Sequence, residues 1–225
     1  MKTWTENKPA TSAREDAYRL LATCYYPPAA AFMEEHCCNS LAKLLAGAAS
    51  EASEASEASE AAGYAAEAAT LIRDSSLDSL AVEHARLFIG PFQLVAPPYG
   101  SIYLDDAKTV MGDSTARVAA FYNSCGLHLA DDFHELPDHF AVELEFMSWL
   151  AFKQREAEVS GDKDEATRVA GLQKEFLDRF LLPWLEPFTS AIINDGEAPF
   201  YQTIARCTVA FVTADYAALT STNNG

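Results

Sequence analysis

Basic residues are scarce in this sequence. It contains 16 Lys and Arg residues against 33 Asp and Glu residues, which gives a formal net charge of −17. A nucleic-acid partner requires clusters of Lys and Arg that neutralise phosphates, and the sequence has none. We therefore exclude nucleic acid as a partner. An acidic surface instead favours solubility and attracts a basic partner such as an arginine-rich peptide.

Long apolar runs are also missing. No window approaches the ~18 uninterrupted apolar residues that a membrane-spanning helix requires, so we expect no stable membrane insertion. The first 16 residues lack an apolar core of the kind found in signal peptides, and we expect no signal peptide there.

The cysteines form no CxxC motif, and their number is odd. This pattern, in a chain of 225 residues, favours a reducing compartment over a disulfide framework. We therefore expect the protein to be cytoplasmic. The cysteines are Cys24, Cys37, Cys38, Cys125 and Cys207.

Common catalytic motifs are absent as well. GxSxG, the P-loop, GxGxxG and HExxH do not occur. The segment MGDST (111–115) resembles the nucleophile motif of some esterases, but that motif follows a strand, and Asp113 or Ser114 fits better as a helix N-cap. A di-iron bundle requires two Glu-x-x-His motifs, and the nearest match is a single Asp131-x-x-His134. We predict no enzymatic activity, metal or cofactor.

Helical periodicity covers almost the whole chain, and strand alternation is scarce. We therefore predict one all-α domain over residues 1–225. A connection rich in Pro, Gly and aromatic residues, 92–106, is too irregular for a helix, and loops of this length are often functional. The predicted helices cover residues 12–28, 31–47, 76–91, 113–127, 137–160, 165–193 (two helices that meet near Pro183) and 199–219.

A three-residue repeat of Ser, Glu and Ala occupies residues 50–62 within the segment SEASEASEASEAAGYAAEAAT. Because the repeat recurs every three residues, each residue type follows a spiral around a helix instead of lying on one face. No stable apolar face therefore forms, although Ala and Glu favour helix. We predict a low-complexity, solvent-exposed and partly helical connector without a role in chemistry.

The segment ELPDHFAVELEFM (135–147) places ionisable side chains in an otherwise apolar stretch. Pro137 suits the first helical position, and Asp138 would then interact favourably with the helix dipole in the first turn. Helical spacing aligns His139 with Glu143 and with apolar residues. Carboxylates beside an aromatic wall are what a receptor for a cationic, partly apolar peptide presents. Two alternatives stay open, a small metal-dependent enzyme that uses Asp138, His139 and Glu143, and a purely structural motif.

Several motifs resemble those of the TorD/DmsD/NarJ family of cytoplasmic maturation chaperones for molybdenum-cofactor redox enzymes. ELPDH (135–139) is similar to the family's E(PX)DH-type signature. HARLFIGP (84–91) is similar to a second signature, aromatic-x-x-Leu-Phe followed by Gly-Pro. APPYGSIYLD (96–105) resembles the family's Pro-rich stretch that ends in Ser-x-Tyr.

The C-terminal segments FLLPWLEPFTSAI (180–192) and PFY (199–201) complete this resemblance, which runs in the same order from Leu80 to Tyr201. Two features depart from the family pattern. His84 replaces the aromatic residue of the second signature, and as an alternative to a ligand contact it could simply fill the apolar stripe of its helix. The Ser-Glu-Ala repeat has no counterpart in the pattern.

The resemblance implies a non-enzymatic, TorD-like chaperone. Such a protein would bind the twin-arginine leader or N-terminal segment of the apo form of a molybdopterin oxidoreductase and delay export or assembly until the cofactor is inserted. An alternative within the class is a NarJ-like assembly chaperone for a membrane-bound subunit that is never exported. The resemblance also implies a monomer or a dimer formed by helix exchange.

The resemblance places the peptide-binding residues in three segments. Asp138 is the preferred acidic contact and Glu135 the second, because guanidinium prefers carboxylates in bidentate geometry. Leu87 and Phe88 would form the groove wall from beneath, and the loop at residues 97–99 would form its rim. The full set of predicted binding residues is His84, Leu87, Phe88, Pro98, Tyr99, Glu135, Pro137, Asp138, His139 and Glu143.

Overall fold

The computed structural model describes residues 13–30, 39–43, 45, 56–90, 94–128 and 135–221. Within these ranges the regular structure is helical and no strand occurs. An isolated antiparallel bridge pairs Tyr99 with His139. The predicted all-α fold class is confirmed. Of the helix predicted for residues 31–47, only 39–43 and 45 lie in the described part, and they are helical.

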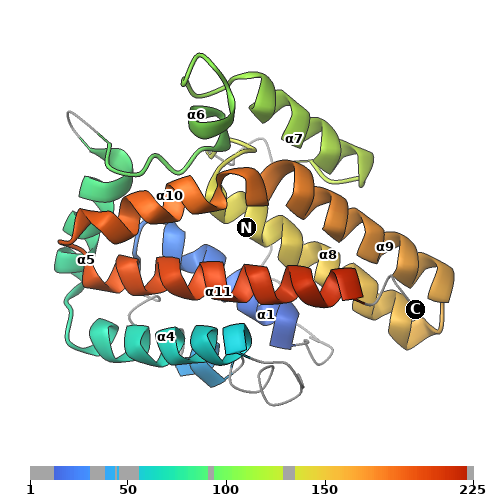
Figure 1. Cartoon of the computed structure of the whole chain (residues 1–225), viewed down its shortest axis with the longest axis horizontal. Coiled ribbons are helices and arrows are strands. Elements are labelled where there is room, and N and C mark those ends of the chain that lie inside the picture. Colours follow the sequence, from blue (N-terminus) through green and yellow to red (C-terminus); the bar gives the residue numbers. More distant parts are fainter. Residues whose placement is uncertain are drawn as a thin grey trace.

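The long helix α11 (Pro199–Ser221) runs along the molecule between two neighbours (Figure 1). Helix α4 (Ser56–Arg73) packs along one side of α11, and α10 (Leu182–Asp195) packs along another. Leu182 and Pro183 open α10 directly after the π-helical turn η2 (Leu177–Leu181), so the predicted break near Pro183 is confirmed.

A second group of helices is built around α8 (Phe140–Ser160). Helix α1 (Ala13–Tyr25) packs on α8 and also contacts α11, and α9 (Lys163–Phe176) packs on α8 from another direction. Gly161 ends α8 in the left-handed conformation, with φ of 78°, which glycine adopts without a steric penalty.

The remaining helices carry the motif segments. Helix α5 (Leu77–His84) continues into the π-helical turn η1 (Ala85–Ile89). The short α6 (Gly100–Leu104) packs against α10 and against α7 (Asp113–Ser124). The prediction that residues 92–106 contain no helix is therefore wrong at α6.

The start of α7 differs from the prediction. Neither Asp113 nor Ser114 is the N-cap; Gly112 holds that position. The carboxylate of Asp105 reaches across and accepts hydrogen bonds from the Ser114 backbone N–H and Oγ, at 3.1 and 2.9 Å to its Oδ2. A Cβ at position 112 would lie 2.1 Å from that Oδ2, so this approach requires glycine.

Part of the Ser-Glu-Ala segment lies in the described residues. Residues 56–62 belong to α4, whereas 50–55 lie outside the described part of the chain. From residue 61 onward the repeat gives way to alanines at helical spacing that are buried against the core. Their small side chains allow α4 to lie close to α11, where Cys207 Sγ donates a hydrogen bond to the Ala61 carbonyl at 3.4 Å. The buried alanines are Ala61, Ala65, Ala68 and Ala69.

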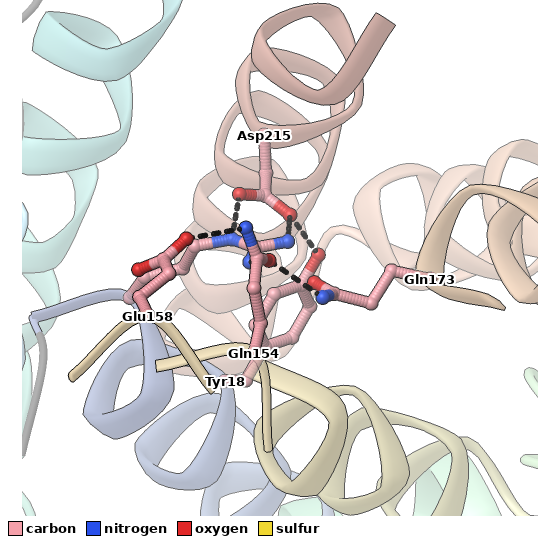
Figure 2. Close-up of polar contacts among 6 residues, drawn as sticks. Tyr18, Gln154, Glu158, Gln173 and Asp215 are labelled. Carbon is pink, nitrogen blue, oxygen red and sulfur yellow. Dashed lines mark hydrogen bonds and ion pairs between the residues drawn. The ribbon is translucent and has the colours of Figure 1, made fainter. Parts of the chain in front are cut away.

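A polar network ties α1 to α11 and α8 inside the fold (Figure 2). The guanidinium of Arg14 donates two hydrogen bonds to the Asp215 carboxylate, from Nη2 to Oδ2 at 2.8 Å and from Nε to Oδ1. Tyr18 donates to the same Oδ2 at 2.7 Å. Gln154 Oε1 accepts from Arg14 Nη1 at 3.3 Å and from Gln173 Nε2 at 2.7 Å. The network therefore joins residues 201 positions apart in sequence.

Candidate functional site

Two of the motif segments meet in space. Phe140 N–H donates to the Pro98 carbonyl and Gly100 N–H donates to the Asp138 carbonyl, each at 2.9 Å. These two bonds form the Tyr99–His139 bridge and hold the Pro-rich loop against the ELPDH segment. The two segments therefore form one surface.

The ELPDH segment lies before α8 rather than inside it. The predicted helix start at Pro137 is wrong, because α8 begins at Phe140 with His139 as its N-cap. The backbone of His139 is extended (φ −71°, ψ 135°), and its Nδ1 accepts a hydrogen bond from Ala141 N–H at 3.2 Å. Asp138 is thus in a turn, and not in the first turn of the helix.

Asp138 is buried, with 1% of the residue exposed. Its Oδ2 accepts a hydrogen bond from Ser101 N–H at 2.8 Å, in the first turn of α6, where a carboxylate is favourable. Among the described residues, its Oδ1 has no hydrogen-bond partner. The carboxylate therefore holds α6 in place, and direct contact with a peptide would require this surface to open.

Glu143 is buried to the same degree, with 1% exposed. Trp184 Nε1 donates a hydrogen bond to Glu143 Oε2 at 3.1 Å. Burial raises the pKa of this carboxyl well above its usual range, the hydrogen bond from Trp184 opposes that shift, and the nearby charge of Asp138 adds to it. Glu143 therefore stays protonated to a pH well above that of an ordinary glutamate.

His139 lies between two tyrosines. The Tyr26 ring stacks parallel to it at 5.6 Å, and the Tyr99 ring meets its edge at 5.2 Å. Its Nε2 lies 3.9 Å from Glu135 Oε2. Burial lowers the pKa of His139 to about 4, although the carboxylate of Glu135 favours the charged form. His139 is therefore neutral near pH 7.

We expect the stability to fall as the pH decreases from 6.5 to about 4. The folded His139 has the lower pKa, so the unfolded chain takes up the proton first, and the free energy of unfolding decreases by up to about 1.4 kcal/mol per pH unit in this window. In the variant His139→Asn, which can still cap α8 but does not titrate, this slope should be smaller when measured by urea denaturation at a series of pH values. An unchanged slope would contradict the assignment.

Glu135 is the acidic residue of the motif that reaches the surface. Its side chain is 30% exposed. Tyr99 donates a hydrogen bond to Glu135 Oε2 at 3.0 Å, and burial together with this carboxylate raises the pKa of Tyr99 to about 12. The turn residue Pro137 is half-buried, and Pro98 is buried under the bridge.

The second signature lies inside the core. His84 is 4% exposed, and its Nε2 lies 3.2 Å from the Tyr25 carbonyl oxygen. Burial lowers its pKa, and its ring meets Phe88 edge-on at 4.9 Å. Leu87 is fully buried, and its carbonyl accepts a hydrogen bond from Ala96 N–H, next to the Pro-rich loop. These positions agree with the core alternative for His84. Leu87 lies next to the Pro-rich loop, whereas the Phe88 ring packs among core aromatic rings such as Tyr201.

Other residues of this surface were not predicted. Tyr26 stacks on His139, and Tyr122 donates a hydrogen bond to the Pro137 carbonyl at 3.0 Å. Glu145 and Trp149 follow on α8. The available signal was the helical period of α8, which places Glu145 and Trp149 four residues apart and therefore on one face.

A metal site has no support in the described part of the chain, where no group of three His, Cys, Asp or Glu side chains is arranged to hold an ion. Asp138, His139 and Glu143 instead each bond to a different partner. None of the described helices combines the length and the apolar character that crossing a membrane requires.

Comparison with known proteins identifies the family. The family model described as "Nitrate reductase delta subunit" matches residues 38–190, about two thirds of the chain. The chain belongs to the nitrate reductase delta subunit family. This confirms the resemblance that the motifs indicated.

Relatives of this family member include named chaperones. "Tat proofreading chaperone DmsD" of Salmonella typhimurium is 32% identical over 148 residues, which cover 64% of this chain and 66% of that protein. "Chaperone protein TorD" of Shewanella pealeana is 30% identical over 157 residues, 67% of this chain and 65% of that protein. The chain thus aligns with slightly less than two thirds of each relative. Neither name describes an enzyme, which agrees with the prediction.

A solved structure has the same fold. It is a crystal structure from Archaeoglobus fulgidus whose description refers to a redox enzyme maturation protein. It superposes with a TM-score of 0.56 at 21% sequence identity, over 92% of this chain and 99% of that one. At this identity the likeness supports the fold alone.

Proposed function

We propose that this delta-subunit family member is a maturation chaperone without catalytic turnover. It binds the twin-arginine leader, or the equivalent N-terminal segment, of a molybdopterin-containing oxidoreductase in the cytoplasm. Binding delays export or assembly until the cofactor has been inserted. The protein acts as a monomer or as a helix-exchanged dimer.

The observation that carries the proposal is the junction of the two motif segments. The Tyr99–His139 bridge brings the ELPDH turn and the Pro-rich loop together, and Glu135 reaches solvent beside aromatic rings. A carboxylate next to apolar surface suits a peptide that carries arginines and an apolar run. The names of the DmsD and TorD relatives support the same class of function.

A second candidate within this class is a NarJ-like assembly chaperone. The match to a family described as the nitrate reductase delta subunit favours it. Its client would be a membrane-bound subunit whose N-terminal segment is never exported. The two candidates differ in whether paired arginines are required.

We expect a synthetic leader peptide with Arg-Arg and an apolar run to bind with low-micromolar or tighter affinity in calorimetric titration. The same peptide with Lys-Lys should bind about tenfold more weakly, because Lys cannot match the bidentate geometry of Arg. Affinity should fall with added salt, since exposed charge pairs are screened. Glu135→Gln should weaken binding through a lost contact.

Asp138→Asn serves as the companion variant. We expect it to weaken binding together with a lower melting temperature, because Asp138 holds the first turn of α6. Equal binding of the Arg-Arg and Lys-Lys peptides would favour the NarJ-like candidate, which a client N-terminal segment without paired arginines would then test. No binding to either kind of peptide would overturn the proposal.

A further inference from the structure

A pocket lies beside the motif surface on the first half of α8. It has a volume of about 200 Å³, which exceeds the roughly 10–15 Å³ needed on this measure to hold one water molecule. We name it the Trp149 pocket. It is lined by Tyr122, Leu127, His128, Val142, Glu145, Phe146 and Trp149.

The walls of the Trp149 pocket are mainly apolar and rigid. The rings of Tyr122 and Phe146 lie 4.5 Å apart, and Phe146 stacks on Trp149 at 5.8 Å. Tyr122 and Phe146 are each 4% exposed, whereas Trp149 is half-buried and open to the surface. Packed aromatic side chains keep their rotamers, so the pocket is preformed for an apolar side chain.

One acidic residue lines the pocket and a second lies on the motif surface. Glu145 is an exposed lining residue, and Glu135 belongs to the motif surface. Tyr26 stacks on His139, whose Nε2 lies 3.9 Å from Glu135 Oε2. Burial raises the pKa of Tyr26, and the charges of Glu145 and Glu135 add to that shift. No Lys or Arg among the described residues forms an ion pair with either. Lys153 Nζ lies 6.0 Å from the centroid of the Trp149 ring and pairs with Glu156 at 2.8 Å.

The pocket and the motif surface are continuous. Tyr122 forms a wall of the pocket and also donates its hydroxyl to the Pro137 carbonyl. Tyr26 stacks on His139 on the other side. A peptide that lies across Tyr26 can therefore place basic residues near Glu135 and Glu145 while the next apolar side chain reaches the pocket.

We propose that the Trp149 pocket binds one apolar side chain of a cationic peptide, with Glu145 and Glu135 binding the adjoining basic residues on either side of Tyr26. This inference rests on the proposed function and assigns the binding of the apolar run to residues outside the recognised motifs. The occupant is identified by charge complementarity, because Glu145 lines an apolar pocket, Glu135 lies on the adjoining surface, and neither carboxylate pairs with a Lys or Arg of the described residues. Glu145 and Trp149 are thereby specificity residues.

The test is titration of the Arg-Arg leader peptide into the full chain and its variants. Glu145→Gln should weaken binding about fivefold, the upper range for one exposed charge pair. Asp164→Asn is the matched control, because it removes one exposed carboxylate from the first turn of α9, beyond the far end of α8, and should leave affinity unchanged.

The pocket itself is tested by a double-mutant cycle. Trp149→Ala is combined with leader peptides in which each apolar residue is changed to Ala in turn. Trp149→Ala should weaken the parent peptide about tenfold, and one Ala peptide should show little further loss. Melting temperatures identify any variant that has lost its fold. If Trp149→Ala does not fold, the affinity of Glu145→Gln still tests the proposal, because Glu145 is exposed and its substitution leaves the core intact.

The outcomes separate the two proposals. If the wild-type chain binds the leader and both Glu145→Gln and Trp149→Ala bind it equally well, the pocket assignment is wrong and the proposed function stands. If the wild-type chain binds no leader, both proposals are wrong. Fully additive losses for every Ala peptide would also overturn the pocket assignment.

Discussion

Replacing Asp215 with Asn is expected to lower the free energy of unfolding by about 3 kcal/mol. Asp215 accepts hydrogen bonds from the guanidinium of Arg14 and from the hydroxyl of Tyr18 (Figure 2). The amide of Asn removes the main counter-charge of Arg14, leaving Glu158 as the remaining one, and turns an N–H group toward a donor. The value lies at the lower end for a buried pair, because 25% of the Arg14 side chain is exposed.

Urea denaturation followed by circular dichroism measures this change. A loss of about 3 kcal/mol corresponds to a decrease in melting temperature of roughly 6–12 °C for a chain of this size. Glu165→Gln is the control, because it removes a carboxylate from an exposed pair with Arg168 on α9 and should leave the melting temperature almost unchanged. Equal effects of the two substitutions would show that the network does not stabilise the fold.

Replacing Trp184 with Ala is expected to destabilise the protein by about 4 kcal/mol. Trp184 is fully buried, with the rings of Phe140 and Phe188 at 5.1 and 5.3 Å. Its loss opens a cavity and removes the donor to Glu143. Position 100 is also affected, since Gly100 lies so close that a Cβ there would be 3.3 Å from the indole. The first turns of α6 and α8 would both lose support.

Two further substitutions separate packing from hydrogen bonding at this site. Trp184→Phe keeps most of the ring volume but removes the indole N–H, and should cost about 1–2 kcal/mol. Trp149→Ala removes a tryptophan that is only half-buried, and should destabilise less than Trp184→Ala. The same denaturation experiment ranks the three variants. A loss for Trp184→Ala no larger than for Trp149→Ala would contradict this account.

Local signals in the sequence predicted the helices well because they act over a few residues. The Pro27–Pro28 pair, Gly161 and Pro199 mark helix boundaries close to those observed. The error at Pro137 arose because a proline also suits a turn, and the preference of His139 for the N-cap is decided by a single hydrogen bond. The capping of α7 was missed because Asp105 lies nine residues before Ser114, beyond the range of local capping signals.

The burial of the motif carboxyl groups could not be predicted from local signals. Periodicity shows which face of a helix is apolar but does not identify the segment that covers it. Asp138 accepts a hydrogen bond from the backbone of Ser101, 37 residues earlier in the chain. Glu143 accepts one from Trp184, 41 residues later. The resemblance to the family predicted which segments matter, and the structure shows which of their side chains reach solvent.

The position of α11 has a consequence for folding during synthesis on the ribosome. This helix is made last among the described elements, yet α1, α4 and α10 all pack on it. Helix α1 therefore emerges from the exit tunnel long before Asp215 is available to neutralise Arg14. A nascent chain cannot close its interior until α11 has been translated, so its apolar helix faces remain exposed to solvent during most of its synthesis.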